Sequence, residues 1–196
     1  MSLASHPLSA EEIAQILSVR PAETSRVWGI ANQAAVLVPL LRLDRAWHLL
    51  LTQRTHSIAT HKGQISFPGG RAEVEDAIPE GTALRETWEE VGIGEKDIHL
   101  AGRLDNFVTH YGVVITPVVG IIQWPVELTL SSDEVSRVFT VPLSWFADEE
   151  NLETRIHVEP DGFQREVFYY REYESDVVWG ITAHIIENLV HILNLR

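Results

Sequence analysis

The sequence has no cysteine among its 196 residues. This absence excludes disulfide bridges, thiolate nucleophiles and zinc sites with cysteine ligands. An excess of basic residues is also missing, because the formal net charge is −13 at pH 7. A surface for duplex nucleic acid needs clustered positive charge, so nucleic acid is a poor candidate for a partner. An acidic protein that handles anionic phosphates would instead need metal cations to offset the charge repulsion.

Long apolar runs are absent as well. No run reaches the roughly 18 residues of a membrane-spanning helix, and the first residues lack the basic and apolar regions of a secretory signal peptide. We therefore expect a cytoplasmic protein with no membrane partner. Its content of 45% hydrophobic and 22% charged residues is ordinary for a soluble protein. Its length predicts a single domain over residues 1–196.

Helical patterns occur at both ends and in the middle of the chain. Near the N-terminus, Ser9 and Glu12 have the spacing of a capping box. The central helix should end just before Gly92, since a glycine commonly follows the last helical residue. The predicted helices cover residues 9–19, 79–91 and 181–195, with one further helical turn at 144–148.

Apolar runs bounded by polar or turn-forming residues predict strands. The first two strands should form a hairpin around a polar turn at residues 42–46, whereas residues 53–63 carry no periodicity and should form a loop. The sequence Pro-Gly-Gly at residues 68–70 should end a short strand. Strands with a central and a terminal helix packed on them indicate an α/β domain. The predicted strands cover residues 34–41, 47–52, 64–67, 100–108, 113–122, 135–141, 155–159 and 167–171.

The central helix gathers acidic side chains on one side. With about 100° of rotation per residue, three glutamates fall within an arc of about 100°, opposite Leu84, Trp88 and Val91. We therefore expect the apolar side to be buried and the glutamates to face a cleft, where Mg²⁺ or Mn²⁺ would find the oxygen ligands that they prefer. The alternative is an ordinary solvated helix face. The three glutamates are Glu86, Glu89 and Glu90.

A pair of glycines precedes this helix. Without a Cβ atom, Gly69 and Gly70 allow the backbone to approach a ligand closely. Together with the acidic helix, residues 70–93 resemble the Nudix box, in which a glycine, a glutamate, an Arg-Glu pair and a Glu-Glu pair recur at fixed spacing. The positions that match in register are Arg85, Glu86, Glu89, Glu90, Gly92 and Ile93.

The first half of the box departs from the family pattern. Gly70 lies one residue too far from Arg85, so the box is one residue longer. The first glutamate of the pattern would fall at Ala77, with Asp76 beside it, and Thr87 stands where an aliphatic residue is usual. The metal-binding half is therefore intact, and the loop half is altered.

The resemblance extends beyond the box and covers most of the chain. Residues 50–54 (Leu-Leu-Thr-Gln-Arg) and 63–70 (Gly-Gln-Ile-Ser-Phe-Pro-Gly-Gly) resemble the signature of the coenzyme A diphosphatase branch, which shares the lengthened box. That signature carries an arginine four residues before its glycine, where this chain has Ala59. Further segments that resemble the branch are 116–120, 134–135, 141–143 and 178–183.

The resemblance implies a Nudix-type α/β/α sandwich with a central mixed sheet. It also implies a hydrolase that uses Mg²⁺ or Mn²⁺ on its three glutamates to cleave coenzyme A into 3′,5′-ADP and 4′-phosphopantetheine. The general base would be Glu89, or Asp133 or Glu134 in the loop before a strand. For Glu134, the alternative is a strand-end residue that pairs with a neighbouring arginine.

The diphosphate of the substrate should lie beside the glycine pair. Candidate substrate-binding residues are Arg54, Lys62, Gly69 and Gly70. Arg54 could instead form a salt bridge with the box, and Arg85 is expected to orient a glutamate of its own helix. Lys62 would supply a point charge in place of the arginine that is absent at Ala59.

Two other functions remain open at this stage. Because of Ala59, the substrate could be another diphosphate, such as ADP-ribose, a dinucleotide or a nucleoside triphosphate. A non-catalytic, nucleotide-binding domain of the same family is a second alternative, although such domains usually lose the metal glutamates. The sequence leaves the oligomeric state open, with a homodimer as one possibility.

Overall fold

The computed structural model of the chain describes residues 8–19, 32–55, 63–109, 111–158, 162 and 164–196. Two positions that bear on the substrate, Ala59 and Lys62, lie outside the described residues. The first described element is α1 (Ala10–Ser18), and its capping box is present as predicted. Ser9 accepts from the N–H of Glu12 at 3.2 Å, and Glu12 accepts from the N–H of Ser9 at 2.7 Å.

A mixed eight-stranded sheet forms the centre of the protein, in the order β3-β2-β1-β7-β5. Three further strands complete the sheet: β4 pairs with β1, β6 with β7 and β8 with β2. The β1–β7 pair is parallel, and the other pairs are antiparallel. The strands are β1 (Gln33–Leu43), β2 (Ala46–Arg54), β3 (Ile65–Ser66), β4 (Gly69–Arg71), β5 (Ile98–Arg103), β6 (Phe107–Val108), β7 (Val114–Ile122) and β8 (Val135–Pro142).

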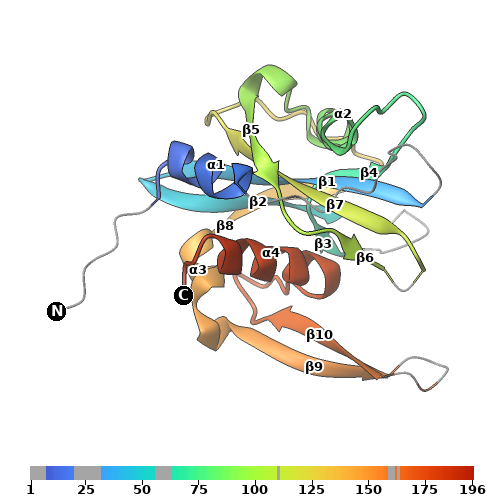
Figure 1. Cartoon of the computed structure of the whole chain (residues 1–196), viewed down its shortest axis with the longest axis vertical. Coiled ribbons are helices and arrows are strands. Elements are labelled where there is room, and N and C mark those ends of the chain that lie inside the picture. Colours follow the sequence, from blue (N-terminus) through green and yellow to red (C-terminus); the bar gives the residue numbers. More distant parts are fainter. Residues whose placement is uncertain (1–7, 20–31, 56–62, 110, 159–161, 163) are drawn as a thin grey trace.

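Helices cover both faces of this sheet. Side chains alternate between the two faces of a strand, and in β1 the residues Leu37 and Leu41 pack in the core beneath α2 (Pro79–Val91), while Val38 and Leu40 pack on the opposite side. That opposite side is covered by α1 and by α4 (Gly180–Ile192). Figure 1 shows α2 and α4 on the two sides of the sheet. The predicted α/β/α sandwich with a central mixed sheet is therefore confirmed.

A smaller two-stranded sheet lies on the α4 side, away from α2 (Figure 1). It is the hairpin of β9 (Leu152–Val158) and β10 (Gln164–Tyr170). The short helix α3 (Leu143–Ala147) connects β8 to this part of the chain, followed by the 3-10 turn η2 (Glu149–Asn151). A second 3-10 turn, η1 (Glu95–Asp97), precedes β5.

Most predicted elements are present, but several of their boundaries differ from the prediction. The first hairpin turns at only two residues, Asp44 and Arg45, whose φ values of 47° and 69° are left-handed, so both strands are longer than predicted. The strand predicted at residues 100–108 is split into β5 and β6. The terminal helix α4 ends at Ile192 rather than at residue 195.

The Pro-Gly-Gly sequence does not merely end a strand, as predicted, but forms a strand itself. Gly69 and Gly70 lie in β4, opposite Val36 and Ala35 of β1. A Cβ atom on Gly69 would lie 2.4 Å from the Ala35 carbonyl oxygen, so only glycine allows this close pairing. The glycine pair is thereby fixed beside the first strand rather than left in an open loop.

None of the helices in the described part of the chain is both long and apolar enough to cross a membrane.

Candidate active site

The helix α2 extends over the predicted residues and carries the acidic cluster. Pro79 stands in its first turn, and Gly92 ends it with φ 75°. A Cβ atom on Gly92 would lie 2.8 Å from the Thr129 side chain, so this glycine also permits close packing of residues 129–134. That segment caps the helix, because the N–H groups of Thr129 and Ser131 donate to the carbonyls of Val91 and Glu90, both at 2.9 Å.

The buried side of α2 matches the side predicted by helical periodicity only in part, because Val91 is buried and Leu84 packs against the core, but Trp88 does not. Trp88 was expected in the core but is 61% exposed, whereas Thr87 is fully buried and Glu90 is only 3% exposed. Thr87 can be buried because its hydroxyl donates to the Ala83 carbonyl at 2.6 Å, which satisfies its polar group. The helix is therefore rotated so that one glutamate points inward, and the glutamates do not form one uniformly exposed face.

The three glutamates consequently have different environments. Glu90 is buried, Glu86 is partly buried, and the Glu89 side chain is 55% exposed. Burial raises the pKa of Glu90 to about 8, against the lowering by Arg54 and the Gly69 N–H and with added repulsion from Glu86 and Glu134. Burial likewise raises the pKa of Glu86, against the lowering by Arg85 and with added repulsion from Glu89 and Glu134.

The glycine pair lies directly against this cluster. The N–H of Gly69 donates to the Glu90 carboxyl group. A Cβ atom on Gly70 would lie 2.5 Å from the Glu86 carboxyl group, so the residue at this position must be glycine for that carboxyl group to approach the backbone. The structure therefore brings together four of the predicted site residues, Gly69, Gly70, Glu86 and Glu90.

Glu134 is also part of the cluster. It lies in the loop before β8, and its charge raises the pKa of both Glu86 and Glu90. Its carboxylate has no ion pair with any arginine or lysine of the described ranges, so the alternative role as a salt-bridged strand-end residue is not seen there.

Arg54, at the end of β2, lies beside the buried glutamate. Its Nη1 is 3.9 Å from Glu90 Oε1, which is an ion pair rather than a hydrogen bond. The alternative of a contact with the box is therefore observed. Its Nε is buried and has no hydrogen-bond partner in the part of the chain that the structure describes.

A second group of charges lies at the other end of α2, around Asp76. Arg85 donates to both oxygens of Asp76, with Nε–Oδ1 at 3.3 Å and Nη2–Oδ2 at 2.9 Å. The Thr82 hydroxyl and the Glu73 N–H also donate to Oδ2, at 2.7 and 2.9 Å. Burial by itself raises the pKa of Asp76, but the bonds from Arg85, Glu73 and Thr82 outweigh it and lower the pKa to about 2.

Asp76 is the site residue that sequence reasoning did not select. The spacing of the Nudix box places its first glutamate at Ala77, and Asp76 was noted only as the adjacent acidic residue. The prediction that Arg85 orients a glutamate of its helix is consistent with its contacts, because Arg85 Nη1 lies 2.9 Å from Glu86 Oε1 and 3.2 Å from Glu89 Oε2. Arg85 thus links the fully bonded Asp76 to the rim of the acidic cluster.

Within residues 8–19, 32–55, 63–109, 111–158, 162 and 164–196, no three acidic or histidine side chains are already arranged as a metal site. The donor set nevertheless suits a hard cation, since it consists of carboxylate oxygens on α2 beside the glycine backbone. Burial, together with nearby negative charges, raises the pKa of two of those carboxyl groups, Glu86 and Glu90. A bound divalent cation would favour their ionised forms.

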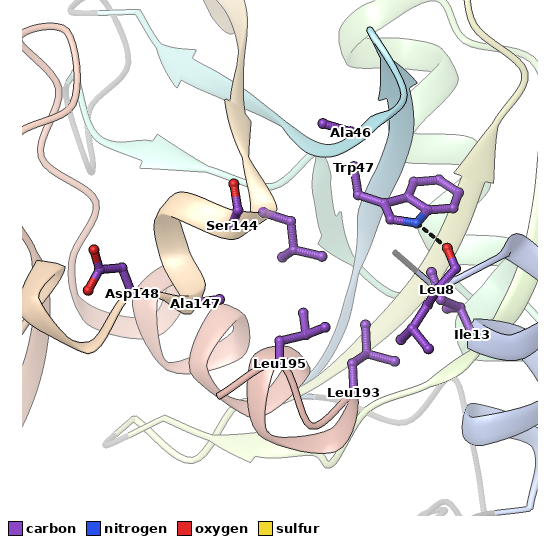
Figure 2. Close-up of a pocket in the computed structure, with 10 residues that line it drawn as sticks. Leu8, Ile13, Ala46, Trp47, Ser144, Ala147, Asp148, Leu193 and Leu195 are labelled. Carbon is purple, nitrogen blue, oxygen red and sulfur yellow. Dashed lines mark hydrogen bonds between the residues drawn. The ribbon is translucent and has the colours of Figure 1, made fainter. Parts of the chain in front are cut away.

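An apolar cavity is formed by other parts of the chain. Figure 2 shows this pocket of about 370 Å³, which includes Ile13, Trp47, Leu193 and Leu195 and none of the glutamates of α2. A wider cavity of about 560 Å³ runs along the outer side of α2 and is lined by Asp76, Arg85 and Trp88, but not by Glu86 or Glu90. Neither cavity coincides with the acidic cluster.

Comparison with known proteins identifies the family of this chain. The NUDIX domain model matches residues 31–167, which include β1, the glycine pair, α2 and Glu134. The chain belongs to the Nudix family, and it is a hydrolase that acts on phosphoric anhydrides. Enzymes of this family generally use divalent metal ions and act on small nucleotide substrates.

Two bacterial relatives illustrate the similarity. The uncharacterized Nudix hydrolase NudL of Citrobacter koseri is 39% identical over 168 residues, which cover 84% of each chain. The protein of the same name from Photorhabdus laumondii is 35% identical over 158 residues, covering 81% of this chain and 83% of the relative.

Solved structures support the fold. A MutT/nudix family protein from Enterococcus faecalis matches with a TM-score of 0.54 and 17% identity, covering 97% of this chain and 71% of that chain. The Nudix hydrolase RenU from M. smegmatis matches with a TM-score of 0.51 and 22% identity, covering 63% of this chain and 78% of that chain. At these identities the likeness concerns the fold alone.

Proposed function

We propose that this protein hydrolyses the diphosphate linkage of coenzyme A or its derivatives, giving 3′,5′-ADP and 4′-phosphopantetheine. The observation that carries the proposal is that Glu86 and Glu90 lie against the backbone of Gly70 and Gly69, with Glu134 close enough to raise the pKa of both carboxyl groups. The choice of coenzyme A is supported by the resemblance of residues 50–54 and 63–70 to the signature of that branch. The whole chain would act as one domain in the cytoplasm, and a homodimer remains a prediction.

Glu86, Glu89 and Glu90 are the proposed ligands of Mg²⁺ or Mn²⁺. When bound, the cation would neutralise the diphosphate charge and lower the pKa of a water molecule. The buried position of Glu90 favours an inner ligand, and the exposure of Glu89 favours a ligand at the rim. For Glu89 to bind the ion, its contact with Arg85 Nη1 at 3.2 Å must be exchanged.

Glu134 is the proposed general base, with Glu89 as the alternative. A base must lie within hydrogen-bond reach of the water that attacks phosphorus. Glu134 faces the same cluster as Glu86 and Glu90, and its carboxylate has no salt-bridge partner in the described part of the chain. Glu89 already contacts Arg85, which reduces its availability as a base.

Arg54, Lys62 and the glycine pair are the proposed substrate-binding groups. The Arg54 Nε lies buried without a hydrogen-bond partner in the described residues, so it is a donor that a phosphate oxygen would satisfy. Gly69 and Gly70 allow the diphosphate to approach the backbone. Lys62 would add a positive charge from its segment.

The test is to identify the products after incubating coenzyme A with the protein and Mg²⁺ or Mn²⁺. We expect 3′,5′-ADP and 4′-phosphopantetheine. Cleavage of ADP-ribose, a dinucleotide or a nucleoside triphosphate with coenzyme A left intact would favour the second candidate, which the alanine at position 59 keeps open. Binding of these compounds without cleavage of any would favour the non-catalytic alternative.

A further inference from the structure

The end of β2 meets β8 at a β-bulge. Gln53 pairs with Arg137, but the next residue, Arg54, pairs with Val135, so Ser136 is an extra residue on β8. The Ser136 hydroxyl donates to the Gln53 carbonyl at 3.0 Å, which stabilises the irregular pairing. A bulge beside a functional site redirects the chain next to it. Here it shifts the residues that meet the end of β2 by one position.

Because of this shift, the residue after β2 binds the segment that carries Glu134. The N–H of Thr55 donates to the Glu134 carbonyl at 2.9 Å. The Thr55 hydroxyl donates to the Asp133 carbonyl at 2.8 Å. Thr55 is only 9% exposed, so water competes little for these bonds. Without the bulge, Val135 rather than Glu134 would lie opposite Thr55.

The other side of the same segment is held by α2. The N–H of Ser131 donates to the Glu90 carbonyl at 2.9 Å, and the N–H groups of Glu134 and Val135 donate to the Ser131 carbonyl at 3.0 and 2.8 Å. The backbone on both sides of Glu134 is therefore fixed between β2 and the helix that carries the metal glutamates. The Glu134 carboxylate itself has no ion pair within the described ranges and remains available.

We propose that Thr55 is a positioning residue that holds the backbone at Glu134 in place beside Glu86 and Glu90, so that the Glu134 carboxylate can reach the attacking water. This inference rests on the proposed function, in which Glu134 is the general base. Small displacements of a catalytic group, on the order of 1 Å, can cost about 100-fold in rate. Thr55 makes two hydrogen bonds to the segment that carries Glu134. A substitution can remove the one from its hydroxyl to the Asp133 carbonyl and leave the backbone bond to Glu134 in place.

The test compares Thr55→Val, which removes only the hydroxyl, with Thr55→Ser, which retains it. With coenzyme A and saturating Mg²⁺, we expect Thr55→Val to lower kcat about tenfold, a part of the roughly 100-fold or larger contribution of a general base, with KM nearly unchanged. Thr55→Ser, which keeps the hydroxyl, should retain most of the wild-type kcat. Glu134→Gln, measured in parallel, should lower kcat more than Thr55→Val does.

Thr182→Val is the matched control. Thr182 is 8% exposed and donates to the Ile65 carbonyl at 3.1 Å, so the substitution removes a similar buried bond on α4. Amide hydrogen exchange across residues 131–135 gives a readout that does not depend on activity. Exchange should become faster in Thr55→Val and stay unchanged in Thr182→Val.

The outcomes separate this inference from the proposed function. If Glu134→Gln lowers kcat but Thr55→Val leaves both kcat and exchange unchanged, the positioning role is wrong and the base assignment stands. If Glu134→Gln leaves kcat unchanged, the base assignment and the positioning role both fail. If Thr55→Val and Thr182→Val lower kcat equally, Thr55 contributes only to general stability. If no compound is cleaved, unchanged amide hydrogen exchange in Thr55→Val still shows that Thr55 does not hold the segment of Glu134 in place.

Discussion

Two buried carboxyl groups at the two ends of α2 have opposite properties. Asp76 accepts hydrogen bonds from Arg85, Thr82 and the Glu73 N–H, and its pKa is lowered to about 2. Glu90 is more deeply buried, at 3% exposed against 8% for Asp76, and it also faces Glu86 and Glu134; burial above all raises its pKa to about 8. Burial disfavours the charged form at both positions. At Asp76 the hydrogen-bond donors outweigh this effect, whereas at the more deeply buried Glu90 the lowering by Arg54 and the Gly69 N–H does not.

This difference separates a structural carboxylate from a functional one. A buried charge with a complete set of donors is stable without any ligand, and removing one partner is costly. A buried charge that faces other carboxylates is unfavourable until a cation binds. Asp76 therefore belongs to the scaffold that holds Arg85, and Glu90 belongs to the site that would hold the metal ion.

The largest expected effect is on catalysis. Glu90→Gln removes the central metal ligand while keeping the side-chain shape, so we expect the turnover of coenzyme A with Mg²⁺ to fall by about 1,000-fold, or roughly 4 kcal/mol. The free energy of unfolding without metal should not fall, because the substitution replaces a carboxyl group whose ionised form is unfavourable in this buried position by a neutral group of the same shape. Steady-state kinetics and urea unfolding measure the two effects. Activity within tenfold of the wild type would show that Glu90 is not a metal ligand.

At the opposite end of α2 the effect should be on stability. Asp76→Asn leaves Arg85 without its bidentate partner, and we expect the free energy of unfolding to fall by about 3 kcal/mol. The control is Glu73→Gln, because the Glu73 side chain is 60% exposed and lies 3.9 Å from Arg85, and it should cost less than about 0.5 kcal/mol. Urea unfolding measures both. Equal losses in the two variants would contradict the scaffold role of Asp76.

A third prediction concerns pH. The folded pKa of Glu90 is about 8, above its ordinary value of 4.5, so its contribution to stability is complete below pH 4.5 and is lost as the pH rises to about 8. Without metal, the free energy of unfolding should therefore decrease over this range, by at most about 1.4 kcal/mol per pH unit for one proton. For Asp76 the sign is reversed, and stability should be lost as the pH falls from 3.8 towards 2.

Thermal unfolding of the metal-free wild type and Glu90→Gln between pH 4.5 and 8 checks the Glu90 part of this prediction. The variant should show a smaller decrease with rising pH. Identical pH dependence in both proteins would mean that Glu90 is not the group responsible.

The sequence predicted the position of α2 better than its orientation. A glycine that follows a helical pattern marks its end, and Gly92 does so here with a left-handed φ of 75°. The rotation of α2 about its axis depends on which polar side chains can form hydrogen bonds within the core. Thr87 is buried because its hydroxyl bonds to the Ala83 carbonyl, and Trp88 is left exposed, although hydrophobicity alone suggests the reverse.

Residues joined by tertiary contacts were predicted unevenly. Glu86, Glu89 and Glu90 were found because they lie on one helix, and Glu134 was selected because it precedes a strand. Asp76 lies in a segment without periodicity, and its importance becomes clear only when Arg85 is placed beside it. The strand β4 was missed because paired glycines predict a turn, whereas here their lack of Cβ atoms permits close pairing with β1.

The most direct test of the central claim is a calorimetric titration of the metal-free protein with Mn²⁺. We expect binding to the wild type and to Glu95→Gln, which changes an exposed acid on η1, and a loss of that binding in Glu90→Gln. Equal Mn²⁺ affinity in the wild type and Glu90→Gln would contradict the claim that the acidic cluster of α2 holds the metal ion.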